Sequence, residues 1–168
     1  MGVKQILLML AAVALVGCGT KDDGVAEGGT TEPKDIIDDL TIIEAAIREN
    51  LKKPTGELTK ADLEKVTFLD FSFNQHQLTD VKGLENLNQL WQLHLSNNQL
   101  TDVQGLEKLT QLRLLDLSRN QLTDVKGLEK LTQLETLYLE DNPDLTKTQI
   151  DELQKALPKC LIISNPTK

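Results

Sequence analysis

Residues Gln99–Asn120 read QLTDVQGLEKLTQLRLLDLSRN, and the chain uses the same template repeatedly. The first fourteen of these residues recur at Gln121–Leu134 with a single change, from Gln104 to Lys126. A further copy starts at Gln77, so the repeat period is 22 residues. Self-similarity at a fixed period of this length predicts a repeat protein, in which each unit packs against its neighbours.

Each copy ends in the pattern Leu-x-x-Leu-x-Leu-x-x-Asn. In one copy the apolar residues Leu93 and Leu95 alternate with three polar ones, Gln92, His94 and Ser96. This period of two predicts a short β-strand with one buried face. A degenerate copy comes before the others, so there are four copies in all. Its corresponding residues are Val66, Leu69, Phe71 and Asn74, followed by the two-residue insertion Gln75-His76.

The first half of each copy has a different spacing. Apolar residues recur there at every third position, as at Val81, Leu84, Leu87 and Leu90. A spacing of three keeps side chains on one side of a 3₁₀-like coil, whereas it drifts around an α-helix. A glycine such as Gly83 stands in this half of every full copy and gives the backbone the freedom that a compact turn needs.

These motifs resemble the leucine-rich repeat, in the short 22-residue form of internalin-like bacterial proteins. The resemblance covers residues 66–145. It implies an α/β fold: a leucine-rich-repeat solenoid with a short parallel β-sheet on its concave face and 3₁₀-like or short helical convex arms. It also implies that ligands bind on the concave face. The composition agrees, because 32 Leu against five aromatic residues indicate one packing environment used many times.

Both ends of the array carry the helical patterns expected of caps, which a stack of repeats needs because its terminal units lack a neighbour. We assign residues 35–65 to an N-terminal cap and residues 146–168 to a C-terminal cap. Thr59-x-x-Asp62 and Thr146-x-x-Gln149 are typical of helix starts. The end of the chain, Cys160–Ile163, is expected to form a last short strand or an edge cover with Cys160 buried. The predicted buried stripe of the first cap consists of Ile36, Ile37, Leu40, Ile43, Ile47 and Leu51.

The N-terminal segment has the features of an export signal. Its apolar run, Ile6–Val16, is eleven residues long, too short to span a bilayer but suited to a signal peptide. The sequence Leu15-Val16-Gly17-Cys18 resembles the lipobox of bacterial lipoproteins. This resemblance implies removal of residues 1–17 and a diacylglyceryl group on Cys18. Ala12-Val13-Ala14 offers an alternative cut inside the apolar run, and a third reading is that Cys18 belongs to a signal discarded whole.

Residues 18–34 are rich in Gly and acidic residues and almost devoid of apolar ones, so we expect a solvated tether. Two acyl chains are sufficient for stable membrane anchoring. Gly19, in place of Asp, resembles the pattern that directs lipoproteins to the outer membrane of two-membrane bacteria. The expected location is therefore the bacterial cell envelope, with the folded domain outside the cytoplasm.

The net charge of −8 has the wrong sign for a protein that neutralises phosphate, so we expect no nucleic-acid partner. Two cysteines allow at most one disulfide. The sequence indicates no cofactor and no metal: His76 and His94 fall on different repeats, and neither has the paired spacing of metal ligands. We expect a monomer.

The concave face, meaning the outward-pointing residues of the predicted strands, differs from copy to copy, whereas the convex arms are nearly identical. It holds most of the aromatic residues and two of the three arginines, and these residue types dominate binding hot spots. We therefore predict a protein or peptide ligand on this face. The candidate contact residues are Phe68, Asp70, Phe73, Trp91, Gln92, His94, Arg113, Leu114, Asp116, Arg119, Tyr138 and Glu140.

A row of asparagines follows the strands where the chain turns inward. Their side-chain amides can satisfy backbone groups that the turn leaves unpaired, which predicts a structural role, the alternative being a ligand-binding row. The row consists of Asn74, Asn98, Asn120 and Asn142.

Two other functions are compatible with the same residues. The chain could be a structural envelope lipoprotein without a selective ligand. It could also be a hydrolase that uses His94 with Asp70 or Asp116, because a carboxylate beside an imidazole is the start of a nucleophilic site. An open sheet excludes no water and offers no oxyanion donors, so we predict that the protein is not an enzyme.

Overall fold

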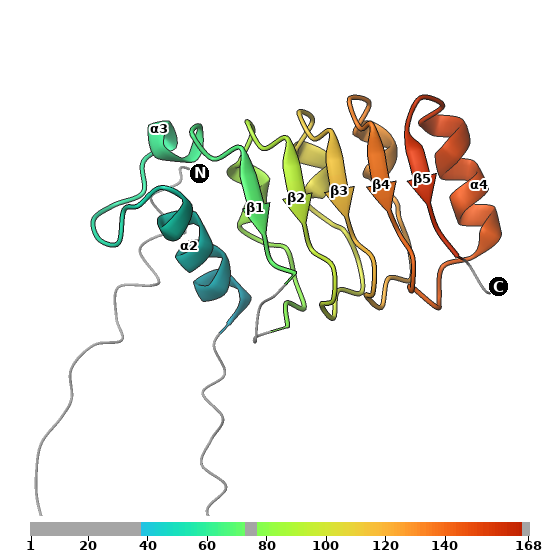
Figure 1. The fold of residues 1–168 in the computed structure, drawn as a ribbon, viewed down its shortest axis with the longest axis horizontal. Helices are drawn as coiled ribbons and strands as arrows, with labels where there is room; N and C mark the ends of the chain where they lie inside the picture. Colours follow the sequence, from blue (N-terminus) through green and yellow to red (C-terminus); the bar gives the residue numbers. More distant parts are fainter. Residues whose placement is uncertain (1–37, 73–76, 166–168) are drawn as a thin grey trace, which may run out of the picture. The chain divides into compact units, whose positions relative to one another are not determined.

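The computed structural model describes residues 38–72 and 77–165. Successive coils of the chain each contribute one short strand to a parallel sheet, and the strands lie in chain order (Figure 1). The predicted parallel sheet is confirmed. The strands are β1 (Phe68–Asp70), β2 (Gln92–His94), β3 (Leu114–Asp116), β4 (Thr136–Tyr138) and β5 (Leu161–Ile163). The described residues exclude several predicted features: the signal peptide, Cys18 and the tether, Ile36, Ile37, Phe73, Asn74 and the insertion Gln75-His76.

The strands pair so that equivalent positions of successive repeats stand side by side. Leu93 is in register with Leu115, and Leu115 with Leu137. These central residues are fully buried, whereas their neighbours in each strand point to solvent, as the period of two predicts. In the copy from residue 99 to 120, the seven apolar positions that recur in every full copy are at most 3% exposed. One set of leucine pockets thus forms the core, coil after coil.

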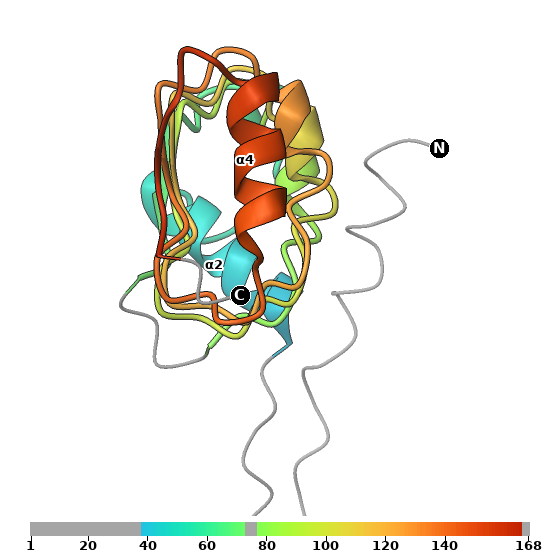
Figure 2. The same ribbon diagram turned by 90° about the vertical axis from the view of Figure 1, so that its right-hand side faces the viewer.

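The convex arms are short 3₁₀ turns, as the spacing of three predicts: η1 (Leu84–Asn86), η2 (Leu106–Lys108) and η3 (Leu128–Lys130). They lie across the coil from the strands (Figure 2). Before η2 the chain turns at Gly105, whose φ of +105° is a conformation that L side chains rarely adopt. The Gly105 N–H donates to the Glu107 carboxylate at 2.6 Å, so the Gly-Leu-Glu sequence closes the turn on itself.

The N-terminal cap contains α2 (Asp39–Asn50) and the short α3 (Lys60–Leu63). As the sequence indicates, Thr59 and Asp62 form a capping box at the start of α3. Helix α2 is joined to the first full repeat by Asp39, whose carboxylate accepts from both Thr79 N–H and Thr79 Oγ1–H and from Asp80 N–H, at 2.7–3.1 Å.

The predicted buried stripe of α2 is wrong at Leu40, which is 37% exposed. Ile42, which the prediction left out, is buried instead, together with Ile43 and Ile47. The helix begins at Asp39, so Leu40 lies in its first turn, at the margin of the contact with the array. There its side chain packs beside Gly83, which has no side chain to cover it.

At the other end α4 (Lys147–Ala156) lies beside η3 on the arm side of the coil (Figure 2). Thr146 and Gln149 form the predicted capping box, and Ile150 and Leu153 face the core. The chain then returns as β5, so the first of the two alternatives for this segment is correct. Cys160 is buried, as expected, and burial raises the pKa of its thiol.

Candidate binding surface

The register of the sheet brings the predicted candidates of the concave face into rows that cross the strands. Asp70 stands beside His94, His94 beside Asp116, and Asp116 beside Tyr138. Adjacent members of such a row are separated by about 4.8 Å, the spacing of paired strands. Residues from four repeats therefore form one continuous surface.

Two aromatic side chains project from the N-terminal half of this surface. Phe68 is 39% exposed and Trp91 is 48% exposed. The Phe68 ring meets the imidazole of His94 edge to face, with ring centroids 5.8 Å apart. Tyr138 is only half-buried, but it lies on β4, two strands away from His94. The structure thus places Phe68 against His94, with Trp91 one position before Gln92, the register partner of Phe68, and Tyr138 two strands away from His94.

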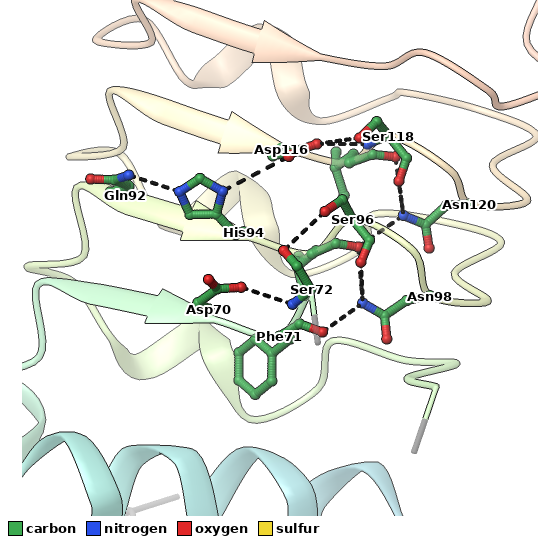
Figure 3. A network of polar contacts seen from close by, with 12 residues as sticks. Asp70, Phe71, Ser72, Gln92, His94, Ser96, Asn98, Asp116, Ser118 and Asn120 are labelled. Atoms are coloured by element: carbon green, nitrogen blue, oxygen red, sulfur yellow. Dashed lines mark hydrogen bonds and ion pairs between the residues drawn. The ribbon is translucent and has the colours of Figure 1, made fainter. Parts of the chain in front are cut away.

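His94 sits at the centre of a small polar network (Figure 3). Its Nε2 lies 2.7 Å from the amide nitrogen of Gln92, and its Nδ1 lies 3.8 Å from a carboxylate oxygen of Asp116. With the Gln92 amide as donor, Nε2 accepts and the proton is on Nδ1, facing Asp116. The other Asp116 oxygen accepts from the N–H and the hydroxyl of Ser118, at 3.0 and 2.6 Å.

This arrangement does not assemble the parts of a hydrolase. The Ser118 hydroxyl donates to Asp116, and the Ser96 hydroxyl donates to that of Ser72 at 2.9 Å. Within the described part of the chain, no hydroxyl is hydrogen-bonded to His94, so the imidazole has no nucleophile to activate. The geometry gives no support to the hydrolase alternative.

The described asparagines of the row are almost fully buried and bonded to backbone (Figure 3). The Asn98 oxygen accepts from Leu78 N–H at 2.8 Å, and its nitrogen donates to the carbonyls of Leu95 and Phe71. Asn120 and Asn142 make the equivalent bonds one and two repeats further on. Each side chain connects its own turn to the preceding coil.

No three or more His, Cys, Asp or Glu side chains gather around a point that could hold a metal ion in residues 38–72 and 77–165. Over the same ranges, no helix has the length and hydropathy needed to cross a membrane.

Comparison with known proteins identifies the repeats. A family model described as leucine-rich repeats (two copies) matches residues 90–129 and 110–155. The fold is the leucine-rich-repeat fold. No curated protein sequence is significantly similar to the chain.

Several solved leucine-rich-repeat structures are similar to the chain. Internalin C2 from Listeria monocytogenes has a TM-score of 0.64 and 27% sequence identity, over 78% of this chain and 57% of its own. A second internalin of that organism has a TM-score of 0.57 and 24% identity, over 75% and 44%. A leucine-rich-repeat protein from Leptospira interrogans has a TM-score of 0.53 and 31% identity, over 63% and 28%. The chain thus spans about half or less of the length of these proteins.

The two arginines predicted on the concave face are each paired with an acidic residue of the next leucine-rich repeat. Arg113 lies 2.9 Å from Glu135, and Arg119 lies 3.6 Å from Asp141. Neither acidic residue was among the predicted contact residues. Opposite charges at the same position of successive repeats are the sequence signal for such pairs, because the register makes these positions neighbours.

The prediction also missed the contribution of β5 to the concave face. Leu161 is 60% exposed, and Ile163 continues the row of His94 and Tyr138 by one strand. This segment lacks the repeat pattern, so its register with β4 could not be read by aligning the chain to itself.

Proposed function

We propose that this protein binds a protein or peptide partner through its concave face. Leucine-rich-repeat proteins use extended surfaces of this kind for recognition. The observation that carries the proposal is the exposure of Phe68 and Trp91 on a face whose residues differ between copies. Exposed aromatic side chains are typical of binding hot spots.

The contrast between the two sides of the coil supports this choice of surface. The convex arms of the copies starting at Gln99 and Gln121 differ at one position in fourteen, so the scaffold leaves them little variety. The strand positions of the same copies share only the buried leucines and the asparagine. Variation confined to one exposed face is expected where that face, and not the scaffold, determines what is bound.

The experiment compares capture of crosslinked partners by the full chain and by variants in the cells that produce it. Trp91→Ala with Tyr138→Ala should lose the partner, while Gln111→Ala on the convex arm should retain it. All three proteins should melt at similar temperatures, since these side chains point to solvent. If the concave-face variant captures the same proteins in equal amounts, the chain is better explained as a structural envelope lipoprotein without a selective ligand.

We further propose that the chain is a lipoprotein of the bacterial cell envelope, anchored through Cys18 with its repeats outside the cytoplasm. The lipobox-like Leu15-Val16-Gly17-Cys18 and the polar segment that follows support this proposal. In a cell with two membranes the expected location is the outer membrane.

Labelling with a radioactive or clickable fatty acid, followed by membrane fractionation, tests the anchor. The wild-type chain should be labelled and sediment with membranes. Cys18→Ala should be unlabelled and released. Unchanged membrane association of the unlabelled variant would rule out the lipid as the anchor.

A further inference from the structure

We infer that the concave face accepts an extended segment of the partner that carries a lysine or arginine within two residues of an apolar side chain. This inference rests on the proposed function and specifies its ligand. Three features of the face lead to it: its size, its exposed aromatic pair and its unbalanced charge.

The size of the face favours a segment over a domain. Five strands at about 4.8 Å give a breadth of roughly 24 Å, and five residues along a strand give roughly 17 Å. The product is a planar footprint of roughly 400 Å², small beside a standard protein interface, to which each partner contributes ~20–30 residues. An extended segment of about seven residues would cross all five strands, at about 3.4 Å per residue.

The aromatic pair defines where the apolar side chain would sit. Both side chains are exposed: Phe68 begins β1, and Trp91 directly precedes β2, one position before Gln92, the register partner of Phe68. The edge-to-face contact with His94 fixes one side of the Phe68 ring and leaves the remainder open. An aliphatic or aromatic side chain placed here would bury surface that is now in water.

The charge of the face indicates which kind of side chain the ligand should carry next to this apolar one. Arg113 and Arg119 are already paired with Glu135 and Asp141, so these four side chains contribute no net charge. The positive charge of the face is therefore neutralised within the protein itself.

Three other carboxylates have no cationic lysine or arginine beside them within the described residues: Asp70, Asp116 and Glu140. Among the described residues, Asp70 accepts the N–H of Ser72 alone, through one of its two oxygens. Asp70 and Asp116 stand on either side of His94, each two positions along its strand from the level of Phe68. A basic side chain next to the apolar one would reach these carboxylates and complete the charge balance.

The test pans a random twelve-residue peptide library displayed on phage against the full chain. Enriched peptides should contain Lys or Arg within two residues of an aliphatic or aromatic residue. Asp70→Asn with Asp116→Asn should lower the affinity of a selected peptide by about tenfold or more, corresponding to roughly 1.4 kcal/mol. Because Asn keeps the oxygen that accepts the backbone N–H, this variant should stay folded, which its melting curve checks.

A matched control has the same change in net charge on the arm side of the coil. Asp102→Asn with Asp124→Asn should change the affinity by less than about threefold, since these residues are remote from the strands and long-range charge effects are screened. Higher salt should narrow the difference in peptide affinity between the concave-face variant and this control variant.

The possible outcomes separate the inference from the proposed function. Peptides that require Trp91 but show no enrichment of basic residues would overturn the inference and leave the binding surface in place. Peptides indifferent to all concave-face substitutions would overturn both. A library without enriched peptides would also overturn the inference, because a face this small must be filled by a segment alone.

Discussion

Replacing Asn120 by alanine is expected to destabilise the array more than any substitution of an exposed residue. Asn120 is 4% exposed, and its nitrogen donates to the carbonyls of Leu95, Leu117 and Ser118 at 2.9, 3.0 and 3.2 Å. Its oxygen accepts from the N–H of Leu100 at 3.1 Å. Alanine leaves the Leu100 N–H without its acceptor in the interior, whereas the carbonyls each keep a second donor: Asn98 for Leu95, Asn142 for Leu117 and the Asn97 N–H for Ser118.

The magnitude follows from the number of buried groups that lose a partner. The buried Leu100 N–H loses its acceptor, and the enclosed carbonyls of Leu95 and Leu117 each lose one of two amide donors. At roughly 1–3 kcal/mol for the one buried group left unpaired and roughly 0.5–1.5 kcal/mol for each of the two other buried hydrogen bonds, the cost is about 2–6 kcal/mol. Domains of this size are stable by about 5–15 kcal/mol, so the loss is a large share of the total.

Urea unfolding followed by circular dichroism measures this loss, and hydrogen exchange at the Leu100 amide measures it locally. The adjacent exposed residue provides a control, because Gln121→Ala should change the free energy of unfolding by less than about 0.5 kcal/mol. If Asn120→Ala costs no more than this control, the hydrogen bonds of the asparagine row do not hold the coils together and the reasoning fails.

Asn120→Asp separates the acceptor from the donors. The aspartate can still accept from Leu100, but an ionised carboxylate would face the carbonyls of Leu95 and Leu117. Burial beside these carbonyls should raise the carboxyl pKa of the folded variant above its unfolded value of about 3.9. The variant should therefore be weakest at neutral pH and approach wild-type stability as the pH falls toward 4. A deficit independent of pH would contradict this account.

Three further outcomes are expected. Gly105→Ala should cost roughly 1–2 kcal/mol of folding free energy through backbone strain alone. Gly127→Ala should cost more, because its new Cβ would lie 3.3 Å from a side chain of the preceding arm; urea unfolding of the two variants measures this difference. Asp39→Ala should lose roughly 1–3 kcal/mol of folding free energy, and a protease should then cleave the N-terminal helix faster than the repeats. Cleavage of the helix and the repeats at the same rate would contradict the cap contact. The hydrogen bond from Lys53 lowers the pKa of Asp62 in the folded protein, so Asp62→Asn should be less stable than wild type at pH 7. The difference should begin to shrink as the pH falls below about 4, the unfolded value, and be lost only in stronger acid, below the lowered folded pKa; a difference independent of pH would refute the assignment.

The sequence was sufficient for the array because one pattern was repeated in register. Once Leu93, Leu115 and Leu137 are recognised as equivalent, their burial and their alignment across the sheet follow from the period alone. The 3₁₀ arms follow in the same way from the spacing of three. The signal for the Glu107 bond was also present, since Gly-Leu-Glu recurs in every full copy, but its reason is a positive φ that becomes visible only in three dimensions.

The caps and the charge pairs required the structure. The position of Leu40 depends on where the first helix begins and on the absence of a side chain at Gly83, and no periodicity within the helix encodes either fact. The pairing of Arg113 with Glu135 depends on the direction that two long side chains take across the strands. Of the candidate surface, the sequence predicted which residues share a face but not which of them neutralise one another.

The connection that the asparagines make, repeated every 22 residues, has a consequence for the length of the molecule. Asn98, Asn120 and Asn142 each accept from the residue 20 positions before them, so every junction between coils uses the same contacts. Excision of residues 99–120 would bring the two flanking copies together as equivalents and create no new kind of junction. The breadth of the binding surface can therefore change by whole repeats. Each repeat removed or inserted removes or adds one strand of the concave face, and with it one strand's breadth of contact with the partner.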